Sequence, residues 1–227
     1  MKQLVLDLGA EPAQSLDTFQ VGENAELAHL MHQFAQRASR EHFAYLWGDT
    51  GAGKTHLLQA LAASPGSRYI AANAPKVDFV HTPAITLYLL DDCHQLSRQR
   101  QIDAFALFNQ IREHGAYMVC TGPVPPAVLG VREDLRTRMG WGLVYQIKGL
   151  SDDEKIAALT HAAEARGLTL SASVLPYLLS HFKRDMRSLS TMLDALDQYS
   201  LETQRPVTLP LLRDLLLQEN LPLEHKE

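Results

Sequence analysis

The sequence predicts an α/β protein in which a parallel sheet with a phosphate-binding loop is followed by a small all-helical domain. Three observations favour this fold class. Short apolar runs alternate with helical patterns between residues 43 and 147, which is typical of βα units. Residues 48–55 match a complete phosphate-loop motif, and the segments after residue 150 show helical periodicity. With 46% hydrophobic and 21% charged residues, the 227-residue chain can bury a sizeable core.

The amino-terminal part is expected to begin extended and then to form one amphipathic helix over residues 24–39. Apolar side chains recur there every three or four positions, at Leu27, Leu30, Met31, Phe34 and Ala38. Buried strands are expected over residues 43–47, 68–72, 85–90, 116–120 and 143–147. Helices over residues 98–114 and 132–138 separate the last three strands, and Gly115 lies where the first of these helices would stop.

The chain changes character near residue 149, where a helical domain begins. Ser151 and Glu154 have the spacing of a capping box, and the helix that they open should end near Gly167. Further helices are expected from residue 171 or 173, over residues 185–200 and over residues 209–218. We therefore expect three parts: a flexible segment of residues 1–15, a nucleotide-binding α/β domain of residues 16–148 and a helical domain of residues 149–227.

Charge and cysteine content exclude several classes of protein. The 26 acidic residues outnumber the 21 lysines and arginines, so no broad basic surface for sequence-specific DNA binding is expected. Two cysteines, Cys93 and Cys120, are too few for a disulfide framework. No apolar run approaches the roughly 20 residues that span a bilayer, and Asp7 comes too early for a secretory signal. These features predict a cytoplasmic protein without membrane contacts.

The most specific motif is a phosphate-binding loop between the first strand and the helix that follows it. Glycines in such a loop let backbone N–H groups point at phosphate oxygens, a lysine supplies a cation, and a threonine hydroxyl binds Mg²⁺. The motif consists of Gly48, Asp49, Thr50, Gly51, Ala52, Gly53, Lys54 and Thr55. His56 follows Thr55 and is either a further nucleotide contact or a residue on the face of the helix that follows the loop. A chance match in an ordinary loop is the alternative.

A pair of acids follows the third predicted strand. Asp91 is expected to bind Mg²⁺ together with Thr55, and Asp92 to orient or activate the attacking water. The alternative is that both carboxylates cap the next helix. Thr121 follows the strand expected over residues 116–120, where its hydroxyl would touch a γ-phosphate or the water. Alternatively, Thr121 is a turn residue at the end of that strand.

Four segments, in this order, resemble the AAA+ module of the DnaA/Hda family of bacterial replication proteins. They are residues 48–55, 89–92, 135–143 and 185–189. The third segment is the most specific, since a phosphate loop alone would indicate only an NTPase. Within this third segment, Trp141 is expected to pack against other side chains and Gly142 to turn the chain. The resemblance covers about residues 16–218. It implies an AAA+ fold with a helical lid, bound ADP or ATP, and Mg²⁺.

Two features match the regulatory members of this family, which inactivate the initiator DnaA. Lys54 and Asp91 are 37 positions apart, which leaves room for a helix, a strand and a proline-containing link. The additional helices with which initiators and helicase loaders grip single-stranded DNA do not fit there. We also find no counterpart of the basic helix-turn-helix domain that follows the lid in initiators, or of their extra N-terminal domains.

The resemblance assigns roles to further residues. Arg138 matches the arginine finger that reaches across a subunit interface to the γ-phosphate held by a neighbour. The alternative for Arg138, and also for Arg136, is an exposed arginine at a helix end. Arg187 in the lid matches the second sensor arginine, which contacts the protein's own nucleotide, with a helix-surface cation as the alternative. Phe19 and Val21 match the segment that binds the nucleotide base.

The first residues resemble the peptide with which regulatory members bind the replication sliding clamp, the β subunit of DNA polymerase III. Spaced leucines can dock in an apolar pocket while a glutamine fixes the register; an edge strand of the sheet is the alternative. The matching residues are Gln3, Leu4, Leu6 and Leu8. Such binding would bring the protein to the nucleoid.

Together these features predict a negative regulator of replication initiation. The expected protein is nucleotide-bound and tethered to the clamp, stimulates ATP hydrolysis on the ATP form of DnaA in trans, and has at most a weak ATPase of its own. Self-association through the same arginine surface is a further expectation. One alternative is a self-contained AAA+ ATPase or helicase-loader-like protein acting on DNA or on a protein partner. Another is a DnaA-binding scaffold whose nucleotide only stabilises the fold.

Overall fold

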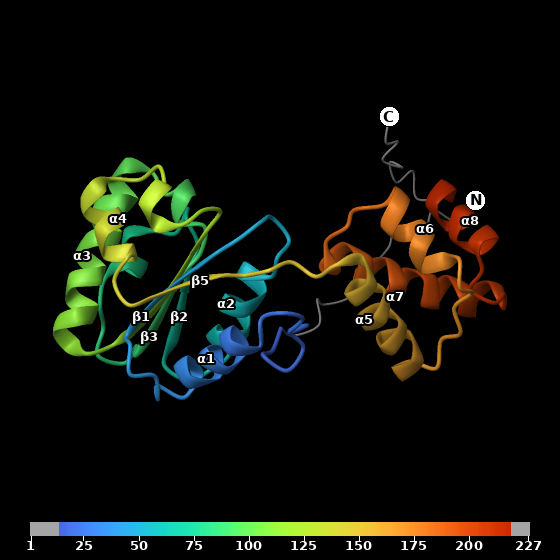
Figure 1. Ribbon diagram of the computed structural model, residues 1–227, viewed down its shortest axis with the longest axis horizontal. Helices are drawn as coiled ribbons and strands as arrows, with labels where there is room; N and C mark the ends of the chain where they lie inside the picture. The colour runs from blue at the N-terminus through green and yellow to red at the C-terminus, as the bar shows by residue number, and fades with distance from the viewer. Residues whose placement is uncertain (1–13, 219–227) are drawn as a thin grey trace. The chain divides into compact units, whose positions relative to one another are not determined.

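The structure, a computed structural model, describes residues 14–218, which divide into two units between Gly149 and Leu150 (Figure 1). The first unit contains a five-stranded sheet with helices on both faces, and the second is a bundle of helices. This arrangement confirms the predicted fold class.

The sheet is parallel throughout, with the strand order β2-β3-β4-β1-β5. Its strands are β1 (Phe43–Trp47), β2 (Ser67–Ile70), β3 (Leu87–Leu90), β4 (Tyr117–Gly122) and β5 (Leu143–Gln146). Because β3 lies between β2 and β4, the segments that leave the carboxyl ends of these three strands come together at one edge of the sheet.

Helices pack on both faces of the sheet (Figure 1). One face is covered by α1 (Ala25–Ala35) and α2 (Lys54–Ala62), and the other by α3 (Arg98–His114) and α4 (Glu133–Met139). Successive residues of β1, such as Tyr45 and Leu46, belong to different core clusters, because side chains alternate across a sheet. Three 3₁₀ turns lie in the connections: η1 (Lys76–Phe79), η2 (Cys93–Gln95) and η3 (Pro126–Val128).

Several element ends differ from the predictions, and three of these differences have local reasons. β2 ends two residues early because the Ala74 N–H donates to the Ala71 carbonyl (3.0 Å) and turns the chain. β3 begins two residues late because the Ile85 N–H bonds to the Thr82 carbonyl (2.9 Å). α1 ends four residues early because Arg37 has a φ of +57° and its guanidinium donates to carbonyls of the last turn.

The second unit consists of α5 (Asp152–Ala165), α6 (Val174–His181), α7 (Met186–Thr203) and α8 (Leu209–Gln218) around its own apolar core. The predicted capping box is confirmed: the Glu154 N–H donates to Ser151 Oγ (3.3 Å) and the Ser151 N–H to Glu154 Oε2 (2.8 Å). The unit is not wholly helical, since Leu170 and Val207 form a parallel bridge.

Among residues 14–218, no helix is long and apolar enough to cross a membrane. The predicted clamp-binding residues Gln3, Leu4, Leu6 and Leu8 lie outside the described residues, so clamp binding stays a prediction.

Candidate functional site

The phosphate-loop motif connects β1 to α2. Gly53, at the start of α2, has a φ of +102°, and a Cβ there would lie 2.9 Å from the Phe19 ring, so this position requires glycine. Among residues 14–218, no side chain caps the amino terminus of α2, so its first N–H groups can bind another acceptor. Asp49, Thr50 and Gly51 at the crest of the loop are exposed. This backbone fits a phosphate group.

Lys54 lies inside the loop and is 9% exposed. Its ammonium group donates to the carbonyls of Gly48 and Asp49, each at 2.7 Å. Burial lowers the pKa of Lys54, and the nearby carboxylates of Asp92 and Asp91 oppose that shift. The loop therefore holds a cation where the motif predicts it.

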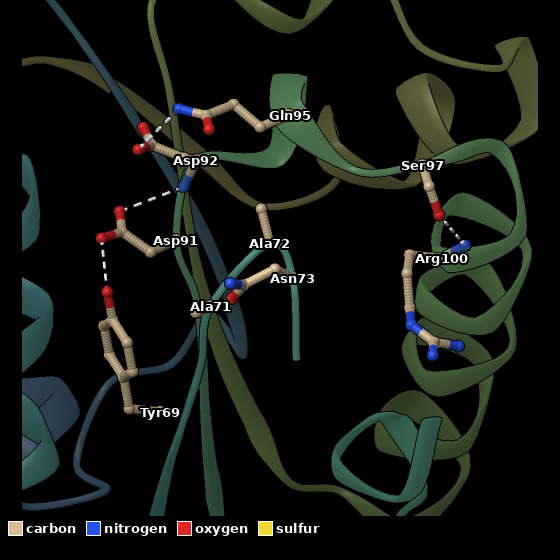
Figure 2. A pocket seen from close by; sticks show the side chains of 9 residues that line it. All are labelled: Tyr69, Ala71, Ala72, Asn73, Asp91, Asp92, Gln95, Ser97 and Arg100. Atoms are coloured by element: carbon tan, nitrogen blue, oxygen red, sulfur yellow. Dashed lines mark hydrogen bonds between the residues drawn. The ribbon is translucent and has the colours of Figure 1, made fainter. Parts of the chain in front are cut away.

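Asp91 follows β3 and is the most tightly held acid of the site (Figure 2). Its Oδ2 accepts a hydrogen bond from the Tyr69 hydroxyl (2.7 Å). Its Oδ1 accepts one from the Thr121 hydroxyl and one from the Asp92 N–H (3.1 Å). Three of about four lone-pair positions of the carboxylate are thus used, which leaves one position on Oδ2 for a cation or its bound water.

Thr121 was expected just after a strand, but β4 extends through it and its side chain is completely buried. Its hydroxyl donates to Asp91 and accepts from the Asp92 N–H (2.9 Å). A turn residue is therefore the wrong interpretation. Contact with a γ-phosphate stays a prediction, while the hydrogen bonds show that Thr121 orients the acid pair.

Tyr69 was missed by the sequence analysis, which treated it as an ordinary residue of a strand. Burial and the hydrogen bond to Asp91 raise the pKa of the Tyr69 hydroxyl. A tyrosine on β2, the strand that pairs with β3, could have indicated this role, because Asp91 and Asp92 follow β3 and a buried tyrosine needs a partner for its hydroxyl.

Asp92 adopts the left-handed conformation, with a φ of +48°, which costs about 1 kcal/mol for a residue other than glycine. It stands at the start of η2 without capping it, so the capping alternative is wrong for this residue. Its Oδ2 accepts a hydrogen bond from Gln95 (3.1 Å), and its Oδ1 is 3.9 Å from His94 Nδ1. Burial and the neighbouring Asp91 raise the pKa of Asp92.

The segment before α1 lies against the loop. Phe19 is buried beneath Gly53, whereas Val21 is 38% exposed and free to contact a ligand. His56 turns toward this segment, with Nε2 3.1 Å from the Ser15 carbonyl and its ring 5.9 Å from that of Phe19. These contacts favour the helix-face interpretation of His56.

A cavity of about 550 Å³ lies beside the acid pair, at the carboxyl edge of β2 and β3 (Figure 2). It is lined by Tyr69, Ala71, Ala72, Asn73, Asp91, Asp92, Gln95, Ser97 and Arg100. Arg100 is already bound to Asp103 (2.6 Å) and to the Ala74 carbonyl (2.9 Å). Among the described residues, no cluster of three or more His, Cys, Asp or Glu could hold a metal by itself.

Arg138 lies in the last turn of α4, at the amino edge of the sheet, where the amino-terminal ends of the strands lie. Its guanidinium carbon is 3.9 Å from the centre of the Trp141 ring, and that ring is 6.0 Å from Phe43, the first residue of β1. The phosphate loop follows the last residue of β1, and roughly 13 Å of strand separates these two ends. Arg187 is the second residue of α7, in the other unit, so its contact with nucleotide stays a prediction.

Comparison with known proteins gives matches to both units. Residues 152–216 match the family described as the Hda lid domain, and residues 11–85 match the bacterial DnaA ATPase domain. An uncharacterized protein of Haemophilus influenzae is 32% identical over 232 residues, which cover 95% of this chain and 98% of the relative.

Solved structures of initiators share the fold. Domain III of DnaA from Thermotoga maritima matches with a TM-score of 0.75 and 20% identity, over 96% of this chain and all of that one. AMPPCP-bound DnaA from Aquifex aeolicus matches with a TM-score of 0.69 and 24% identity, over 84% of this chain and 67% of that one. The AAA+ fold expected from the sequence is confirmed.

Proposed function

The chain belongs to the DnaA/Hda family of AAA+ proteins as a DnaA-related replication regulator, and from this premise we propose that it inhibits initiation by stimulating hydrolysis of ATP bound to DnaA. The premise rests on the matches of this chain to the bacterial DnaA ATPase domain and to the Hda lid domain, and on the relative that is 32% identical over 95% of the chain. The partner, the direction of the effect and the tether to the clamp are parts of the proposal.

The position of Arg138 is the observation that carries this proposal. It lies at the amino edge of the sheet, while the chain's own phosphate loop lies at the carboxyl edge. Among the described residues, Arg138 forms no ion pair that would neutralise its charge. An unneutralised guanidinium remote from its own nucleotide site is suited to act on the nucleotide of a partner.

The chemistry follows from the charge that develops during phosphoryl transfer. A guanidinium placed against the γ-phosphate of the partner stabilises that charge, and arginine fingers of this kind accelerate hydrolysis by about 10³–10⁵ in other systems. In this reaction the proposed roles of DnaA are to hold the ATP and to position the water, and the role of this chain is to supply Arg138.

The chain's own nucleotide would be ADP or ATP with Mg²⁺. The phosphates would lie on the loop around Lys54, the base near Val21, and the metal between Thr55 and Asp91. When bound, Mg²⁺ would supply positive charge that offsets the negative charge of the phosphates. The fit rests on the positive φ of Gly53, the uncapped start of α2 and the remaining acceptor position on Asp91.

The tether is proposed to be the segment with Gln3, Leu4, Leu6 and Leu8, bound to the sliding clamp. It would concentrate the protein on replicating DNA in the nucleoid, so that DnaA is inactivated only after replication has started. A clamp pull-down tests this part: Gln3→Ala with Leu6→Ala should abolish binding. Unchanged binding would remove the tether from the proposal and leave the finger untouched.

The decisive experiment measures hydrolysis of ATP preloaded on DnaA, with clamp loaded on DNA. The wild-type chain should accelerate hydrolysis, and Arg138→Ala should return the rate to that of DnaA alone. Arg136→Ala is the matched control, because it removes an arginine of the same helix that has no described side-chain contact, and it should keep most of the acceleration. Full activity of Arg138→Ala would refute the trans mechanism and favour a scaffold.

A second candidate function, a self-contained ATPase, is favoured by the complete set of Lys54, Thr55 and Asp91 in the site. It predicts steady ATP turnover without DnaA that is abolished by Lys54→Ala and by Asp92→Asn. If single-stranded DNA stimulates ATP turnover by this chain, and the chain has no effect on hydrolysis by DnaA, the self-contained ATPase is the correct function and the regulator is not.

A further inference from the structure

The arginines in the described part of the chain are held in several ways, and Arg138 differs from those that form ion pairs. The ion pairs described for residues 14–218 join five arginines to aspartates: Arg100 with Asp103, Arg132 with Asp134, Arg166 with Asp194, Arg184 with Asp152, and Arg205 with Asp214. Arg138 instead lies over aromatic rings, with its guanidinium carbon 3.9 Å from the centre of Trp141 and 5.1 Å from that of Phe105. Its Nε is buried and has no hydrogen-bond partner, so contact with the rings is what holds this side chain.

Trp141 is itself fixed by the backbone around it. The backbone N–H of Trp141 donates to the Arg138 carbonyl (3.0 Å), and this bond folds the chain back directly after α4. Gly142 then has a φ of +72°, and a Cβ there would lie 2.2 Å from the Phe43 carbonyl oxygen. This close approach brings the Trp141 ring edge-on to Phe43, which in turn stacks on Phe108 in the core at 5.6 Å. The ring is therefore anchored to β1 and α3.

Stacking has a consequence that an ion pair would not have. A guanidinium carries its five N–H donors in its plane, so a ring beneath its face fixes its orientation and leaves most of the donors at its edge available. A carboxylate partner would occupy those same donors and neutralise the charge that the reaction needs. Arg112 also lies over the Trp141 ring, at 4.8 Å, so that two guanidinium groups contact the same indole.

We infer that Trp141 is a positioning residue for Arg138: its ring sets the direction in which the finger reaches the partner's nucleotide. This inference rests on the proposed function. It goes beyond the finger itself, since it assigns to the indole an effect on the rate of hydrolysis but not on the binding of the partner.

The test separates rate from binding. Hydrolysis on DnaA is followed at increasing concentrations of this protein, which yields a maximal rate and a half-saturating concentration. Trp141→Leu should lower the maximal rate about tenfold, the order expected for loss of one desolvated cation–π contact, and change the half-saturating concentration less than about twofold. Trp141→Phe, which keeps a ring, should stay within about threefold of the wild-type rate.

Two controls keep the result interpretable. Melting curves and retained nucleotide binding identify a variant that has merely unfolded, in which case the decision rests on Trp141→Phe against Trp141→Tyr. In a chain that already carries Arg138→Ala, Trp141→Leu should have no further effect on the maximal rate, because the ring acts through the finger. A larger loss in the double variant, or a changed half-saturating concentration alone, would make Trp141 a docking residue and overturn the inference.

A readout that does not depend on DnaA tests the contact itself. The chain has two tryptophans, so a Trp47→Phe background leaves Trp141 as the only tryptophan, whose emission can be excited selectively over that of the tyrosines. Arg138→Ala should change the intensity and position of its emission, whereas Arg136→Ala should not. Unchanged emission would overturn the inference whatever the hydrolysis shows. Changed emission, with hydrolysis insensitive to both Arg138→Ala and Trp141→Leu, would instead overturn the proposed function, and the inference with it.

Discussion

The two edges of the parallel sheet hold their charged groups by different physical means. At the carboxyl edge, Asp91 is 4% exposed and accepts hydrogen bonds from Tyr69, Thr121 and the backbone of Asp92. At the amino edge, Arg138 is held by a ring, and no described carboxylate pairs with it. Directional bonds fix a buried anion but use its acceptor positions, while stacking fixes a cation and leaves its donors free. The first arrangement suits a group that acts within its own chain, and the second a group that acts on a partner.

The largest expected effect concerns the close approach that anchors the amino edge. Gly142→Ala should lower the free energy of unfolding by about 3 kcal/mol, because the added Cβ meets a backbone carbonyl and φ is positive. Gly115→Ala is the matched control: φ is also positive there, but the space is open, and about 1 kcal/mol is expected. Urea unfolding followed by tryptophan fluorescence measures both. Equal losses would mean that the approach to Phe43 does not fix Trp141.

At the carboxyl edge, Thr121→Val should lower the free energy of unfolding by about 2 kcal/mol. The substitution keeps the shape but removes the hydroxyl that donates to Asp91 and accepts from the Asp92 N–H, so buried polar groups lose partners. Thr137→Val, which removes an exposed hydroxyl bonded within α4, should cost less than about 0.5 kcal/mol. If both variants unfold at the same urea concentration, the hydrogen bonds do not hold the acid pair.

A smaller effect is expected when Asp91 loses its other donor. Tyr69→Phe should cost about 1 kcal/mol of stability and weaken binding of the magnesium nucleotide a few-fold, because one buried hydrogen bond to a carboxylate is lost. Tyr145→Phe removes an exposed bond to Glu26 and should change neither quantity measurably. Calorimetric titration with ADP and Mg²⁺ compares the two. Tighter binding by Tyr69→Phe would show that this hydroxyl competes with the metal.

The smallest effect is a dependence of stability on pH. Burial and Asp91 raise the pKa of Asp92 in the folded protein above its ordinary value of 3.8, so the folded state binds more protons than the unfolded state between these two values. Asp92 therefore contributes a loss of stability as the pH rises through its folded pKa. Asp92→Asn should remove that loss and stabilise the protein at neutral pH by less than about 1 kcal/mol, since the side chain is 38% exposed and solvent screens it.

The difference between Asp92→Asn and the wild-type chain should disappear below pH 3.8, where the carboxyl is protonated in both states. Unfolding curves across pH 3 to 8 measure it. A variant that is less stable than the wild type at pH 7 would show that the bond from Gln95 outweighs the cost of burying the carboxylate beside Asp91.

Local sequence was sufficient wherever an element depends on its own residues. The bounds of β1, α3 and α8 agree with the prediction, because apolar periodicity and the turns beside these elements define them. The capping box of Ser151 was readable for the same reason: both of its bonds join residues three positions apart. The loop between β1 and α2 belongs to this group, since its motif is one continuous run of residues.

What the tertiary structure alone decided are the contacts between residues distant in the chain. The strand order places Tyr69 of β2 and Thr121 of β4 on either side of Asp91. The local sequence patterns of β2, β3 and β4 do not show that these three residues are neighbours. The sequence by itself determined that this protein has a phosphate loop, a pair of acids and an arginine after a short helix. Only the folded sheet put the loop and the arginine at opposite edges and laid Arg138 on Trp141, because packing at long range, not local periodicity, decides which side chains meet.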